Sequence, residues 1–90
     1  MGNSNPTRAE IETAIKEYIT EAFLYDRQDV SLTNDFPLFE QGIIDSMGLF
    51  RLISFLEEKF GFAVKPEEIL IESFSSVDTI TTLVEESMGR

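Results

Sequence analysis

The stretch most suggestive of chemistry runs from Gly42 to Phe50 and reads GIIDSMGLF, with the polar pair Asp45 and Ser46 between apolar residues. An apolar pattern with helical spacing follows directly, which predicts a helix starting at Ser46 with Asp45 as its N-cap. Ser46 would then be the first helical residue, and its hydroxyl would have no capping duty. Free amides and the positive end of the helix dipole stabilise a phosphate ester there. Ser46 is therefore a candidate acceptor for a phosphate-linked group, although helix capping alone also explains an Asp-Ser pair.

The composition of the 90-residue chain excludes several kinds of catalytic site. It contains no Cys and no His, so disulfides, thiolate nucleophiles and the commonest general base and metal ligand are absent. An enzyme in its own right is the least favoured class, and we predict no metal site. The length suits one domain spanning residues 1–90. We expect residues 1–6 to be disordered and the core to span about residues 8–88.

The charge balance is strongly acidic, with 17 Asp and Glu against 7 Lys and Arg and a net charge of −10. Nucleic acid and anionic membrane surfaces are disfavoured as partners, because both need a basic patch. Proteins with basic surfaces would be attracted, although such acidity can also serve solubility alone. No apolar run reaches transmembrane length, and the first residues lack the hydrophobic core of a signal peptide. We therefore expect a cytoplasmic protein.

Four segments have helical signals, separated by a long loop over residues 26–44. The first helix starts after a capping box, Thr7 with Glu10, and ends near Leu24 or Tyr25. The second runs from Ser46 to about Gly61, a short third lies within residues 65–74, and the last follows Ser75-Ser76. The apolar stripe of the second helix comprises Met47, Phe50, Ile53 and Leu56 and is widened by Leu49, Leu52 and Phe60. In the third helix, Ile69, Leu70 and Phe74 would point inward. The fold class predicted is all-α, a four-helix bundle with three longer helices.

The chain resembles the acyl carrier protein family from about Ile11 to Glu86. The matching segments are residues 38–47 (LFEQGIIDSM), 52–53, 56–60 (LEEKF), 64–69 (VKPEEI) and 74–80 (FSSVDTI). An isolated Asp-Ser would carry no information. An Asp-Ser-hydrophobic triplet that opens the second of four helices, with the FSSVDTI segment following later, is specific.

The resemblance implies a function. In that family, a dedicated phosphopantetheinyl transferase attaches 4′-phosphopantetheine from coenzyme A to the serine that matches Ser46. Asp45 would help the transferase and its metal ion to dock, and Met47 would meet partner enzymes and the arm. The chain would then be a non-catalytic, monomeric carrier. It would hold acyl or aminoacyl groups as thioesters and shuttle them between ligases, transferases and synthases of a lipid pathway, such as fatty acid biosynthesis, or of a secondary-metabolite pathway.

The chain departs from the family pattern early in the second helix. Carriers of primary fatty-acid synthesis usually have acidic residues at the positions that match Gly48 and Arg51. We expect a more apolar docking face here, made by Met47, a bare patch at Gly48, an exposed Leu49, and Arg51. The departure suggests a specialised carrier, whose cargo is an amino acid, a hydroxy acid or an unusual fatty acid.

A cavity between the second and third helices is a further expectation. It would shelter a fatty chain and be lined by Ile53, Leu56, Val64, Ile69 and Phe74. Each of these residues, taken singly, is explained more simply by ordinary core packing.

Two rival interpretations remain. Residues 29–40 partly imitate a calcium-binding loop, with oxygen-bearing side chains from Asp29 onward and Glu40 at the twelfth position, but Asn34 replaces the expected Gly. The other rival is a small helical adaptor that binds a protein partner and needs no prosthetic group. The adaptor should tolerate Ser46→Ala, whereas a carrier should not.

Overall fold

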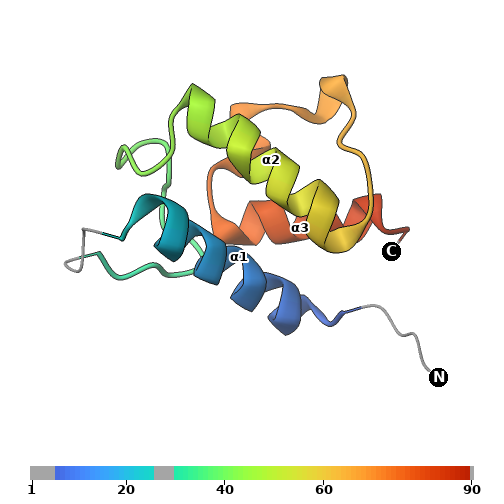
Figure 1. The fold of residues 1–90 in the computed structure, drawn as a ribbon, viewed down its shortest axis with the longest axis horizontal. Coiled ribbons are helices and arrows are strands. Elements are labelled where there is room, and N and C mark those ends of the chain that lie inside the picture. Colours follow the sequence, from blue (N-terminus) through green and yellow to red (C-terminus); the bar gives the residue numbers. More distant parts are fainter. Residues whose placement is uncertain (1–5, 26–29, 90) are drawn as a thin grey trace.

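The computed structural model describes residues 6–25 and 30–89, and these residues form helices and loops without a strand. The α-helices are α1 (Arg8–Phe23), α2 (Ser46–Phe60) and α3 (Val77–Ser87). Helix α1 runs opposite to α2 and α3 (Figure 1). The predicted all-α class is confirmed. No helix within the described ranges is both long and apolar enough to cross a bilayer. The disorder expected at the start of the chain concerns residues 1–5, which lie outside the described ranges, and Pro6.

The expected short third helix is replaced by two 3₁₀ turns, η1 (Pro66–Glu68) and η2 (Ile71–Phe74). Leu70 between them is extended, with φ −119° and ψ 142°. Ile69 is half-buried and Phe74 fully buried, and on one regular helix these two residues would point roughly 140° apart. The break at Leu70 lets both side chains turn toward the core. Leu70 itself is 49% exposed, so its predicted inward position is wrong.

The predicted helix starts are confirmed because they depend on local hydrogen bonds. The Thr7 hydroxyl accepts from the Glu10 N–H at 3.2 Å, and the Glu10 carboxylate accepts from the Thr7 N–H at 2.8 Å. Helix α2 begins at Ser46 with Asp45 as N-cap, and its C-cap residue Gly61 has φ 74°. Positive φ values favour glycine there.

The long connection after α1 is anchored by hydrogen bonds to the start of α3. The Leu38 N–H donates to the Ser75 carbonyl at 2.8 Å, and the Asp78 N–H donates to the Asn34 carbonyl at 2.9 Å. The core joins this connection to all three helices. Its fully buried large side chains include Ile11, Ile15, Ile19, Leu38, Leu52, Leu56, Phe74 and Ile80. The loop is thus part of the core, which explains its many apolar residues.

Arg8 connects α1 to α3 on the surface. Its guanidinium lies 2.6 Å from the Glu85 carboxylate and 3.0 Å from that of Asp78. The hydrogen bond to Asp78, helped by the one to Glu85, raises the pKa of Arg8 above its usual value. The side chain stays about 40% exposed, so its ion pairs contribute little to stability. They orient α1 and α3 rather than hold them together.

The buried face of α2 differs from the predicted one. Met47 and Phe50, which belong to the predicted apolar stripe, are 76% and 60% exposed. Exposure of Met47 is what its expected place on a docking face requires, whereas Phe50 was not expected at the surface. Four residues of the predicted stripe, Leu49, Leu52, Ile53 and Leu56, are buried, together with Gly48. Apolar residues surround most of the first three turns of α2, so periodicity alone leaves the choice of face open.

The N-cap of α3 allows a stability test. The Ser76 hydroxyl accepts from the Thr79 N–H at 3.3 Å, so Ser76→Ala should lower the free energy of unfolding by about 1 kcal/mol. Ser87 is the matched control, because its buried hydroxyl has no hydrogen-bond partner among the described residues. Ser87→Ala should leave stability unchanged or raise it. Urea unfolding followed by circular dichroism measures both, and equal losses would contradict the assigned cap.

Candidate functional site

Ser46 is exposed at the first position of α2. The preceding Asp45 accepts the Gly48 N–H on its carboxylate at 2.8 Å and the Leu49 N–H on its carbonyl at 2.8 Å. The N–H groups of Ser46 and Met47 have no acceptor within the described part of the chain. Free amides at a helix start favour an anion, and the dipole adds to this. A phosphate ester on the Ser46 hydroxyl therefore fits the site.

The segment before Ser46 is held rigidly. The N–H groups of Ile43 and Ile44 both donate to the Leu38 carbonyl, at 2.9 and 3.3 Å. All three residues are buried, and Gly42 turns the chain with φ 73°. Two buried residues thus directly precede the exposed pair Asp45 and Ser46. This arrangement presents the serine at the surface on a fixed support.

Gly48 serves packing rather than a bare surface patch. It is buried, and a Cβ atom at this position would lie 2.8 Å from Cε1 of Phe23. Leu49 is only 7% exposed, so the expectation of an exposed Leu49 beside Met47 is wrong. Phe50 takes that place on the surface. The spacing of three residues between Met47 and Phe50 could have revealed this pair.

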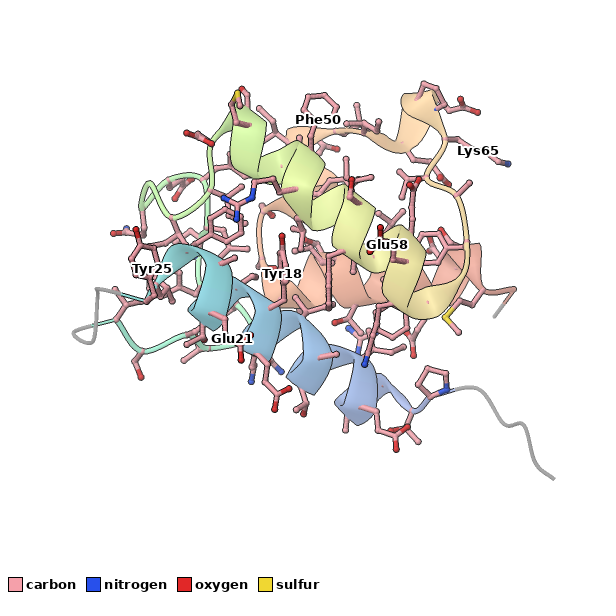
Figure 2. All side chains as sticks on the ribbon, in the orientation of Figure 1. Tyr18, Glu21, Tyr25, Phe50, Glu58 and Lys65 are labelled. Carbon is pink, nitrogen blue, oxygen red and sulfur yellow. The ribbon has the colours of Figure 1, made fainter. Side chains whose placement is uncertain are left out.

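Arg51 is exposed, and its guanidinium packs against an aromatic ring of α1. Its guanidinium carbon lies 5.2 Å from the centroid of the Phe23 ring, within cation–π range. The Tyr18 hydroxyl donates to the Arg51 carbonyl at 3.3 Å, and the Tyr18 ring stacks on Phe55 at 4.2 Å. Tyr18 lies between α1 and α2, whereas Phe50 points away from α1 (Figure 2). Contacts with Phe23 and Tyr18, both on α1, therefore fix the position of Arg51.

The residues expected to line an acyl cavity belong to the core or pack against it. Leu56 and Phe74 are fully buried, Ile53 and Val64 are buried, and Ile69 is half-buried. A hollow of about 460 Å³ lies elsewhere, between the loop and η2, where Phe39, Glu40, Ile71 and Glu72 contribute to its walls. A sheltered fatty chain between α2 and the 3₁₀ turns stays a prediction.

The calcium-loop interpretation gains no support. Asp29, its first position, lies outside the described residues. The Asp35 carboxylate accepts from the Thr33 hydroxyl at 2.8 Å. Across residues 6–25 and 30–89, no three Asp or Glu side chains gather as a metal site would require.

The structure is that of a small helical domain that presents a serine at a helix start, where a phosphate-linked group can be attached. Comparison of the sequence with known proteins leads to the same kind of domain. Residues 13–84 match the family model described as "Phosphopantetheine attachment site". The chain belongs to this family of carrier proteins. Membership implies a covalently attached 4′-phosphopantetheine prosthetic group.

Curated relatives are carrier proteins of nearly the same length. The chain is 31% identical over 75 residues to a probable acyl carrier protein, PigG, of Serratia sp., which covers 83% of this chain and 85% of the relative. It is 34% identical over 79 residues to a D-alanyl carrier protein of Streptococcus suis, covering 88% and 96%. A D-alanyl carrier protein of Streptococcus pyogenes is 37% identical over 76 residues, covering 81% and 94%. These relatives do not support a place in fatty acid biosynthesis.

The close approach of Gly48 to Phe23 leads to a test by double mutation. Alanine favours a helix over glycine by about 1 kcal/mol, yet Gly48→Ala should lower the free energy of unfolding by about 1 kcal/mol, because overpacking against the ring costs more. In a Phe23→Leu background the same substitution should be neutral or stabilising. Denaturant unfolding of the four proteins measures the coupling. Additive effects would show that the contact is unimportant.

Asp45 offers a test that separates its capping oxygen from its charge. Asp45→Ala should lower the free energy of unfolding by about 1 kcal/mol, because the Gly48 N–H loses its acceptor. Asp45→Asn keeps an oxygen at that position and should stay within about 0.5 kcal/mol of the wild type. Thermal and urea unfolding at neutral pH distinguish the two. A large loss in Asp45→Asn would mean that the charge, rather than the cap, stabilises α2.

Proposed function

We propose that this protein is a non-catalytic carrier whose 4′-phosphopantetheine arm is attached to Ser46. The observation that carries the proposal is the exposed Ser46 at the start of α2, beside two amides without acceptors in the described structure. The family match over residues 13–84 supports the nature of the group. When bound, the group supplies a thiol that holds a cargo as a thioester. The chain has no Cys of its own for that purpose.

The residues beside Ser46 have separate roles in this proposal. Asp45 caps the helix that presents the serine, and its exposed carboxylate is available to the phosphopantetheinyl transferase and its metal ion. The free N–H groups of Ser46 and Met47 favour the phosphate that joins the arm to the protein. Met47 is exposed one residue after the attachment point, where partner enzymes must approach. The chain would act as a monomer in the cytoplasm.

We favour a small acyl or aminoacyl cargo in a lipid or secondary-metabolite pathway. Of the three relatives described above, two are named as D-alanyl carriers and one as a probable acyl carrier. The side chains that would have to part for a long chain, Leu56 and Phe74 among them, are fully buried. Opening the core there would sacrifice close packing. A short cargo that stays outside the bundle avoids this cost.

Attachment at Ser46 can be tested by intact-mass measurement. The wild type, incubated with coenzyme A, magnesium and a broad-specificity phosphopantetheinyl transferase, should gain one phosphopantetheine. Ser46→Ala should gain none, because no hydroxyl remains at the helix start. Ser54→Ala is the matched control, since Ser54 is also an exposed serine of α2, and it should be modified like the wild type.

The adaptor alternative predicts a different result. If the folded wild type gains no mass while a control carrier is modified, Asp45 and Ser46 only begin a helix. Circular dichroism shows whether each variant is folded, so that a missing modification is not mistaken for unfolding. Modification of Ser46→Ala would place the arm on another residue.

A further inference from the structure

The hollow of about 460 Å³ between the loop and η2 combines apolar walls with carboxylates. Three of its wall residues are apolar, and three others are exposed and acidic. The apolar ones are Pro37, Phe39 and Ile71, and the acidic ones are Asp35, Glu40 and Glu72. Sites for small molecules have volumes in this range and are mostly apolar, with a few polar groups that fix the ligand. We call this feature the acidic hollow.

The walls of the acidic hollow are held in place by hydrogen bonds. The Leu38 N–H donates to the Ser75 carbonyl at 2.8 Å, which joins the loop to the residue that follows η2. The Ser75 hydroxyl donates to the Glu72 carbonyl at 3.1 Å, and the Ser76 hydroxyl accepts from the Thr79 N–H. The hollow is therefore preformed, and a ligand would not have to order its walls.

The carboxylates of the acidic hollow have no cation to balance them. Among the described residues, no Lys or Arg contributes to its walls, and every ion pair involves Arg8. The Asp35 carboxylate accepts from the Thr33 hydroxyl at 2.8 Å, whereas those of Glu40 and Glu72 have no partner in the described structure. Like charges repel, so a bound cation would be favoured. Within residues 6–25 and 30–89 the carboxylates do not converge as a metal ion requires. The matching ligand is a larger, organic cation with an apolar part.

The acidic hollow lies near the serine that would carry the arm. The Ile44 N–H donates to the carbonyl of Leu38, the neighbour of Phe39 in the wall. Ser46 follows Ile44 by two residues, which span at most about 7 Å. A cargo tethered to Ser46 would therefore stay close to the hollow. Tethering by a short flexible linker gives an effective concentration on the order of millimolar, so even a weak site would be occupied.

We propose that the acidic hollow binds an aminoacyl cargo carried on Ser46, with the cargo's ammonium group paired to Glu40 and Glu72 and its apolar part against Phe39 and Ile71. Ile71 is 63% exposed and therefore available for this contact. The inference rests on the proposed carrier function and narrows the cargo to the aminoacyl class. A neutral acyl group would gain the apolar contact but leave the carboxylates unpaired. The buried core need not open, because the hollow already lies outside it.

The test compares two cargoes that differ by one ammonium group. A broad-specificity phosphopantetheinyl transferase loads isotope-labelled protein from D-alanyl-coenzyme A or from propionyl-coenzyme A, and intact mass confirms each product. D-alanine is chosen because relatives of this chain are named as its carriers. The amide NMR shifts of residues 39–40 and 71–72 should differ between the two forms, since only the D-alanyl form has an ammonium group. High salt should reduce the difference, because exposed ion pairs are screened.

Variants that remove single charges show whether the carboxylates bind the ammonium group. Glu40→Gln and Glu72→Gln should each at least halve the shift differences between the two cargoes. Glu67→Gln is the matched control, because Glu67 is exposed in η1, outside the walls of the hollow, and the change in charge is the same. It should leave the differences unchanged. Circular dichroism checks that all variants are folded, and intact mass checks that they carry the same cargo.

Each contrary outcome points to a different failure. Equal shifts for the two cargoes at the acidic hollow would overturn the proposal and leave the carrier function intact. Differences confined to the amides beside Ser46 would have the same meaning. Equal reductions in Glu67→Gln and in the two hollow variants would attribute the effect to net charge and also overturn the proposal. A wild type that accepts no phosphopantetheine from coenzyme A itself would remove the carrier function.

Discussion

The first turn of α2 packs against the ring of Phe23, and this contact decides how the candidate site is presented. Because Gly48 has no side chain, the ring approaches the helix closely, and the side of α2 that carries Gly48, Leu49 and Leu52 turns inward. Met47 and Phe50 consequently face solvent. The same ring supports the guanidinium of Arg51. One glycine thus links the orientation of α2 to the chemical character of its exposed face.

The support for Ser46 comes from both sides of it in the sequence. Before it, Leu38, Ile43 and Ile44 are buried and joined by backbone hydrogen bonds. After it, the Gly48 N–H donates to the Asp45 carboxylate and closes the first turn of α2. The loop that contains Leu38 is itself bonded to Ser75, just before α3. A serine fixed in this way is accessible to other enzymes without any movement of the core.

Charge is distributed so that the site differs from its surroundings. Carboxylates outnumber cations in the chain, and Arg8, in the first turn of α1, pairs with Glu12, Asp78 and Glu85. Arg51 has no carboxylate partner among the described residues, and its guanidinium lies instead over the ring of Phe23. A local cation on an otherwise acidic surface gives this region an electrostatic character of its own. Net charge alone therefore describes this protein poorly as a binding partner.

The sequence by itself determined the all-α class, the starts of α1, α2 and α3, and the position of Ser46 at a helix start. These features depend on residues within four positions of one another, such as Thr7 with Glu10 and Asp45 with Gly48, so local physics suffices. The tertiary structure alone decided which side of α2 is buried, because apolar residues surround its first turns and the contact with Phe23 joins residues distant in the sequence. It also decided that residues 66–74 form two 3₁₀ turns, since Ile69 and Phe74 must both reach the core. Local patterns cannot contain such constraints, because they arise only when the helices pack together.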